Sequence, residues 1–96
     1  MHNRNALERP FSEDTVQAVW EKGSPSEHDS AVYRRDVCGT LIKRDMYGKE
    51  EDFGWEIDHI FPKSKGGGDD LSNLQPLQWR NNRSKGDTYP WSCRTS

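Results

Sequence analysis

Apolar residues near the start of the chain recur at helical spacing. They fall on one face of a helix and comprise Val16, Val19 and Trp20. Ser12 precedes them and can accept hydrogen bonds from free backbone N–H groups, so we expect an amphipathic helix over about 13–22. Residues 1–10 show no such pattern and are expected to form a disordered, frayed tail. A partly alternating run at 40–47 is a candidate strand.

The second half of the chain shows a more regular succession. Residues 55–60 (WEIDHI) alternate as a half-buried strand does. Three consecutive glycines disfavour regular structure over 63–70, because glycine loses the most backbone entropy on folding. A short apolar piece at 74–77 and a basic helix over 79–86 follow. The pattern thus predicts a unit of strand, loop, short strand and helix.

The composition is that of one small α+β domain spanning residues 1–96. Only 30% of the 96 residues are hydrophobic and 31% are charged, so the core must be thin. The chain contains four tryptophans, and each of them can bury a large area. We therefore expect these side chains to form much of the core.

Charge is distributed unevenly along the chain. The formal net charge is −2, which argues against a generic basic nucleic-acid-binding protein. Residues 76–85 nevertheless carry three bases, Arg80, Arg83 and Lys85, and no acid. A local basic face on an acidic protein is therefore compatible with the sequence.

The two cysteines, Cys38 and Cys93, do not make a disulfide framework, although one bridge between them stays open. The first residues have no apolar run of the secretory-signal type, and no apolar run approaches membrane-spanning length. We therefore expect a cytoplasmic protein without membrane association, in which both cysteines are free thiols.

Asp58 and His59 are adjacent polar residues in the predicted strand 55–60. Neighbouring side chains of a strand point to opposite faces, so one of the two is expected to face inward. A buried carboxylate is costly unless it is paired or binds a metal. If the basic helix packs across the hairpin, Asn82 approaches Asp58. Together they would offer a carboxylate and an amide oxygen to a hard cation such as Mg²⁺.

His59 is the natural general base of such a site, because a neutral imidazole can take a proton from water near neutral pH. Asn73 follows the glycine-rich loop and either orients the imidazole ring or braces the loop. It can equally be a simple loop cap, since Asn favours turns. Glu56 shares the strand face of Asp58 and is either an auxiliary ligand or a surface carboxylate.

The same residues carry a resemblance to a known family. The spacing of four of them matches the HNH endonuclease motif: Asp58 and His59, Asn73 fourteen positions after His59, and Asn82 nine positions further. The runs IDHIFP, KGGGDDLSNLQPL and NNRSKGD are similar as well. The match covers about residues 55–87 and rests on several positions in order.

The resemblance implies the ββα-metal fold of this family, here with an added N-terminal helix. It also implies that Asp58 and Asn82 bind Mg²⁺, Mn²⁺ or another divalent cation. His59 would be the general base, and Asn73 would steady it. The neighbouring Asn81 is the alternative ligand, but the spacing to the following lysine favours Asn82, at a position where many members carry His.

One feature departs from many small HNH domains, which hold a structural zinc with two CxxC pairs. The upstream pair would fall at Arg35 and Cys38 and the downstream pair at Gln78 and Asn81, so one thiolate is present. We therefore expect no structural zinc. Aromatic packing is the expected replacement, with four candidates: Trp20, Trp55, Trp79 and Trp91.

The function implied by the resemblance is metal-dependent hydrolysis of phosphodiester bonds in double-stranded DNA. Five basic residues are expected to contact phosphates: Lys63, Lys65, Arg80, Arg83 and Lys85. They would position the DNA backbone and would not read the base sequence. The alternative for these cations is a solvated helix face. The rival hypothesis for the protein is a metal- and DNA-binding module of a larger assembly that does not cut.

Overall fold

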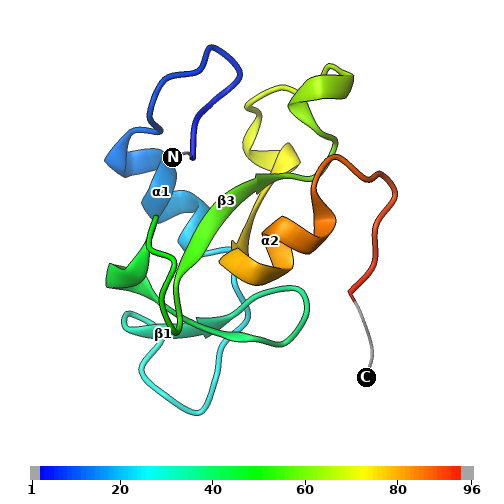
Figure 1. The fold of residues 1–96 in the computed structure, drawn as a ribbon. Coiled ribbons are helices and arrows are strands. Elements are labelled where there is room, and N and C mark those ends of the chain that lie inside the picture. Colours follow the sequence, from blue (N-terminus) through cyan, green and yellow to red (C-terminus); the bar gives the residue numbers. More distant parts are fainter. Residues whose placement is uncertain (1–2, 94–96) are drawn as a thin grey trace.

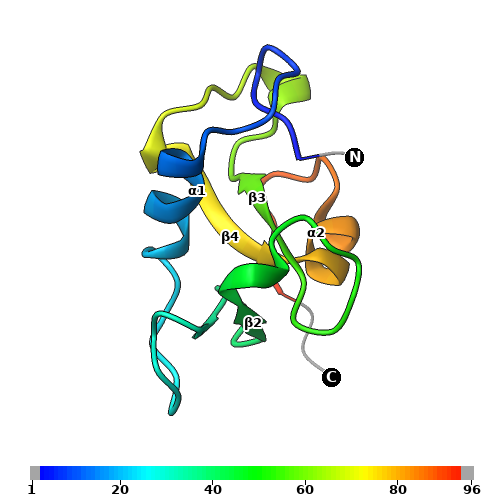
Figure 2. The same ribbon diagram turned by 90° about the vertical axis from the view of Figure 1, so that its left-hand side faces the viewer.

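The computed structural model describes residues 3–93 (Figure 1). A hairpin of two antiparallel strands lies at its centre, with one helix on each side, as Figure 2 shows. These elements are α1 (Glu13–Trp20), β3 (Trp55–His59), β4 (Leu74–Gln78) and α2 (Trp79–Lys85). A second antiparallel pair comprises β1 (Tyr33–Arg35) and β2 (Leu41–Lys43). Three 3₁₀ turns complete the set: η1 (Arg44–Met46), η2 (Lys63–Lys65) and η3 (Leu71–Asn73).

The succession β3, β4, α2 with α1 added in front confirms the predicted α+β class. Helix α1 begins as predicted, because the Ser12 side chain accepts a hydrogen bond from the backbone N–H of Thr15. It ends at Trp20, two residues earlier than expected. Its buried face carries the side chains that the helical spacing identified: Val16, Val19 and Trp20.

Strand β3 separates two different environments. Its residues 55 and 57 join the apolar core under α1, and the His59 ring, on that same face, packs against Phe11 with ring centroids 5.9 Å apart. Glu56 and Asp58 point to the other face, where their carboxylates bond to side chains of α2. All five residues of β3 are buried. The alternation of the strand therefore places acids between the hairpin and α2, and apolar groups between the hairpin and α1.

Strand β4 contains Pro76, which pairs with Ile57 of β3. Proline lacks the N–H that a central strand needs, and β4 accommodates it because it has a ladder partner on one side alone in the described chain. The segment 63–70 also differs from expectation in part. Its first three residues form η2, which ends at Gly66 with a φ of 100°, a value that glycine adopts readily.

Residues 3–10 differ from the expected frayed tail. The Asn3 side chain accepts a hydrogen bond from Ile57 N–H (2.6 Å) and donates one to the Ile57 carbonyl (2.8 Å), on the edge of β3 away from β4. Lys63 Nζ donates to the Arg4 carbonyl (3.1 Å) and lies 3.0 Å from Glu8 Oε2. The sequence pattern missed these contacts because they join residues more than fifty positions apart. We call residues 3–10 the strap.

The cysteines are not free thiols: Cys38 and Cys93 form a disulfide with their Cα atoms 5.5 Å apart. The chain after α2 turns back to the β1–β2 turn, and this return brings the two sulfurs together. The disulfide corrects the expectation of free cysteines. Between residues 3 and 93 no helix is long and apolar enough to span a membrane.

A buried carboxylate ties together residues 35–38 and 78–81, the two segments at which the CxxC pairs of a structural zinc site would fall. Asp36 is 3% exposed and accepts hydrogen bonds from the backbone N–H of Gln78 (2.9 Å) and from Asn81 Nδ2 (3.0 Å). Hydrogen bonds therefore join these two segments. Of the four tryptophans, Trp20 and Trp55 are fully buried, and they pack against each other between α1 and β3 with ring centroids 5.3 Å apart.

Candidate active site

A polar cleft of about 510 Å³ opens where β3 ends and the following loop begins. Asp58, His59 and Asn82 all line it, together with residues of the strap. Asp58 and His59 point to opposite faces of β3, so a cleft that both can reach must pass around the edge or the end of that strand. One molecule bound in this cleft could therefore contact both Asp58 and His59.

Asp58 is buried, at 5% exposure, and its carboxylate has two partners. Gln75, its cross-strand neighbour, donates from Nε2 to Oδ2 (2.9 Å), and Lys85 Nζ lies 3.2 Å from Oδ1. Burial raises the pKa of the Asp58 carboxyl, while the hydrogen bond from Gln75 and the charge of Lys85 act in the opposite direction. A cation that bound Asp58 would share this carboxylate with the Lys85 ammonium.

Asn81 and Asn82 have separate partners. The Asn81 amide donates to Asp36 (3.0 Å) and to the Thr40 hydroxyl (3.1 Å), on the side of the β1–β2 turn. The Asn82 amide donates from Nδ2 to Glu56 Oε1 (2.8 Å). That bond fixes the plane of the amide, so Oδ1 is directed away from Glu56. Asn82, and not Asn81, lines the cleft.

Glu56 is a buried acid whose charge is compensated on α2. Arg83 bonds to both of its carboxylate oxygens, at 2.6 and 3.1 Å, and also reaches Glu50 at 2.6 Å. A two-point contact of this kind holds the carboxylate in one orientation. Glu56 thereby fixes the Asn82 side chain. It does not face solvent, so it is not the surface carboxylate that the sequence allowed as one alternative.

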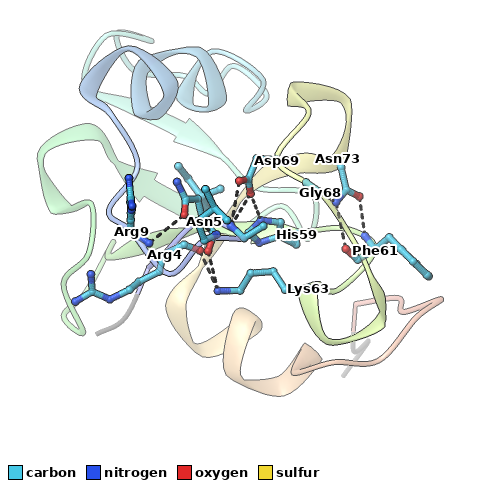
Figure 3. Close-up of polar contacts among 12 residues, drawn as sticks. Arg4, Asn5, Arg9, His59, Phe61, Lys63, Gly68, Asp69 and Asn73 are labelled. Carbon is cyan, nitrogen blue, oxygen red and sulfur yellow. Dashed lines mark hydrogen bonds and ion pairs between the residues drawn. The ribbon is translucent and has the colours of Figure 1, made fainter.

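His59 is 7% exposed, and one edge of its ring faces Asp69. Nε2 lies 2.8 Å from Asp69 Oδ1 (Figure 3). Partial burial alone would raise the pKa of Asp69, but hydrogen bonds from His59 and from the backbone N–H of Ala6 outweigh it and lower the pKa. Because an ionised carboxylate accepts hydrogen bonds, it favours a proton on Nε2, and in the neutral ring the lone pair is then on Nδ1.

Asn73 bonds to the loop and not to the imidazole. Its Oδ1 accepts from Phe61 N–H (2.8 Å), and its Nδ2 donates to the carbonyls of Phe61 (3.1 Å) and Gly68 (2.9 Å). The backbone N–H of Ile60 also donates to the Asn73 carbonyl. Of the roles that the sequence suggested for Asn73, these contacts correspond to bracing the loop, as Figure 3 illustrates.

The five candidate phosphate-binding cations differ in their surroundings. Lys85 is 3% exposed beside Asp58, Arg83 is paired with acids, and Lys63 holds the strap. Arg80 lies over the Trp79 ring, 4.7 Å from its centroid, and is exposed. Lys65 is exposed as well. Arg80 and Lys65 are therefore the two cations of this set that no carboxylate engages in residues 3–93.

Comparison with known proteins adds one match. A family model described as HNH endonuclease matches residues 38–91, more than half of the chain. The chain belongs to the HNH endonuclease family. The matched segment includes β3, the loop, β4 and α2, and with them every residue of the motif spacing. No curated protein and no solved structure matches the chain significantly.

Membership in the HNH family indicates a nuclease-type function on nucleic acid. Within residues 3–93, no three or more His, Cys, Asp or Glu side chains are grouped so as to hold a metal ion. A divalent cation of the kind that HNH nucleases use would therefore have few protein ligands here. Asp58 and Asn82 are among the residues with side-chain oxygens that line the cleft.

The sequence did not predict three contacts made by Asp58 and His59. Asp69 faces His59, Gln75 bonds to Asp58, and Lys85 pairs with Asp58. Gln75 was detectable in principle, because the register of the hairpin places it directly opposite Asp58. Asp69 carried no such signal: it belongs to an irregular loop, and the sequence does not fix the path of that loop.

Proposed function

We propose that the protein is a metal-dependent endonuclease that hydrolyses phosphodiester bonds in double-stranded DNA, with His59 as the general base. One observation supports this proposal above the others. Asp58, His59 and Asn82 line a single cleft, although the first two leave β3 on opposite faces. A base and two oxygen ligands around one open space suit the attack of water on a phosphodiester.

Asp58 and Asn82 would hold the cation. A carboxylate and an amide oxygen suit a hard ion such as Mg²⁺ or Mn²⁺, and a site with few protein ligands leaves positions for water and phosphate oxygens. When bound, such an ion would neutralise the scissile phosphate and stabilise the departing oxygen. Glu56 keeps the Asn82 oxygen directed away from itself, and Lys85 limits the charge that accumulates around Asp58.

His59 would take the proton from the attacking water at Nδ1. Its Nε2 is engaged with Asp69, so Nδ1 is the ring nitrogen with a lone pair to accept that proton. Burial of the ring and its contact with Phe11 restrict its rotation. Asn73 acts on this base indirectly, because it fastens the loop that leaves β3 directly after His59.

The basic residues would position the DNA backbone. Lys65 and Arg80 are exposed and suited to direct phosphate contacts, which would weaken as salt rises. Lys63, Arg83 and Lys85 remain part of the proposed set. In their present contacts they neutralise acids or hold the strap, and DNA would have to compete with those partners.

Nicking of supercoiled plasmid tests the proposal. The native protein is incubated with plasmid in Mg²⁺, in Mn²⁺ and in EDTA, and compared with His59→Ala. His28→Ala is the matched control, because His28 is an exposed histidine outside the cleft. We expect nicking by the native protein and the control with metal alone, and none by His59→Ala. If every protein shifts the plasmid on a gel but leaves it intact, the non-catalytic binding module replaces this proposal.

A further inference from the structure

We propose that Asp69 is the positioning residue of the general base: it holds His59 in the tautomer and orientation in which Nδ1 faces the reacting water. The inference rests on the proposed function, because it assigns a role in the same reaction. Asp69 lies outside the motif residues Asp58, His59, Asn73 and Asn82, in the irregular loop between Gly68 and η3.

The first support is the contact itself. Asp69 Oδ1 lies 2.8 Å from His59 Nε2, within the range of a charge-assisted hydrogen bond. A carboxylate that accepts from Nε2–H removes the other neutral tautomer, in which Nε2 would lack a proton. When Nδ1 takes a proton from water, the ring becomes positive and the adjacent carboxylate stabilises that charge, as the aspartate of a Ser-His-Asp triad does.

The second support is that Asp69 is itself held in place. Its side chain is 35% exposed and lies on a loop, so it needs a restraint to act as a fixed acceptor. The backbone N–H of Ala6 in the strap supplies one, at 3.0 Å from both carboxylate oxygens. The strap is tied to the core by Asn3 and to η2 by Lys63, as described above. Figure 3 shows strap, carboxylate and imidazole converging.

The third support is that the loop is fixed on its other side as well. Asn73 Nδ2 donates to the carbonyl of Gly68, the residue directly before Asp69. Strap and loop therefore restrain the carboxylate from two directions. Nothing else in the described chain hydrogen-bonds to the His59 ring, so loss of the carboxylate leaves the orientation of the ring to packing against Phe11.

The experiment compares Asp69→Asn with Asp70→Asn. The control removes the same charge one position along the chain, from an aspartate whose side chain caps nothing in η3. Plasmid nicking at saturating metal gives kcat and KM. Long-range ¹H–¹⁵N correlation spectra of the ¹⁵N-labelled imidazoles report the tautomer of His59 without requiring activity. Asp69→Glu, which keeps a carboxylate, is the conservative variant, and thermal unfolding checks that each protein folds.

We expect Asp69→Asn to lower kcat by at least roughly tenfold, with KM for DNA unchanged. Loss of the partner of a metal-ligating histidine costs about tenfold to a hundredfold, and loss of the aspartate of a Ser-His-Asp triad costs more. The His59 signals should move from one tautomer towards a mixture. Asp70→Asn should behave as native, and Asp69→Glu should retain more kcat than Asp69→Asn. A native kcat, a native His59 spectrum or equal losses in both Asp69 variants would overturn the inference. If the native protein nicks no DNA, the proposed function fails, and the spectra still decide whether Asp69 sets the tautomer.

Discussion

Asn81 and Asn82 are neighbours on α2, but their amides bond to different parts of the molecule. Asn81 donates to a buried carboxylate, Asp36, and so connects the helix to the β1–β2 turn. Asn82 donates to Glu56 and lines the cleft. The same substitution, Asn to Ala, can therefore be made at both positions. It tests a structural role for Asn81 and a metal-binding role for Asn82.

We expect Asn82→Ala to raise the Kd for Mn²⁺ by at least roughly tenfold, since even the loss of an outer-shell partner costs that much. Its free energy of unfolding should change little, because Glu56 keeps its two bonds to Arg83. Asn81→Ala should instead lower the free energy of unfolding by about 1–3 kcal/mol, because it removes two hydrogen bonds, one to the buried Asp36 carboxylate and one to the Thr40 hydroxyl, with Mn²⁺ affinity unchanged. Isothermal titration and urea unfolding measure both quantities. Equal Mn²⁺ affinities for the two variants would contradict the assignment of Asn82.

Some residues of the candidate site could be predicted from the sequence, and others could not. The motif spacing singled out Asp58, His59 and Asn82 because it reflects a strand and a helix, whose geometry is regular. It could not find Asp69, since the partner of a side chain in an irregular loop depends on the path of the backbone. The spacing also did not predict that Lys85 is buried beside Asp58, because a helix rich in basic residues is normally expected to face solvent.

At the scale of elements, the glycine-rich loop carries different constraints at neighbouring positions. Gly67 is buried, and a Cβ there would lie 1.8 Å from the Phe61 carbonyl oxygen, because the loop closes back onto the end of β3. Gly68 has open space around its Cα and no positive φ. A glycine is therefore required at position 67, where the loop lies close to the Phe61 carbonyl, and is not required at position 68.

Gly67→Ala should disrupt the loop that carries Asp69, while Gly68→Ala serves as the matched control. A clash with backbone cannot be relieved by a side-chain rotation, so we expect Gly67→Ala to lose about 1–3 kcal/mol of unfolding free energy or more. Gly68→Ala should stay within about 0.5 kcal/mol of native. Urea unfolding measures the difference. A Gly67→Ala protein as stable as Gly68→Ala would mean that the loop does not close onto Phe61 as described.

Elements with strong local signals were predictable from the sequence, and contacts between distant segments were not. Helix α1 follows from Ser12 and the apolar spacing behind it, and β3 from the alternation of apolar and acidic residues over 55–58. The strap was missed because its restraints come from Ile57 and Lys63, far along the chain. The same holds for η2, whose three residues resemble a loop in composition.

The whole molecule depends on links between its two halves, because its apolar core is small. Among residues 3–93, the buried apolar cluster contains seven residues and extends from α1 through β2 to the β3–β4 hairpin. Two further links lie on the opposite side of that hairpin. One is the hydrogen-bonded carboxylate of Asp36, and the other is the disulfide that joins the β1–β2 turn to the chain after α2. The first fastens the β1–β2 turn to α2, and the second fastens it to the chain that follows α2.

Reduction of the disulfide should therefore lower stability substantially. Cys38 and Cys93 are 55 positions apart, and closing a loop of that length corresponds to about 4 kcal/mol at 25 °C in the chain-entropy treatment. For a small domain this is a large share of a total that is typically about 5–15 kcal/mol. We expect dithiothreitol to shift the urea midpoint of the native protein downwards. It should leave the Cys38→Ser/Cys93→Ser double variant, already at the lower midpoint, unaffected. A native midpoint that does not respond to reductant would show that the two cysteines are not bonded in solution, and no covalent link would then join the β1–β2 turn to the chain after α2.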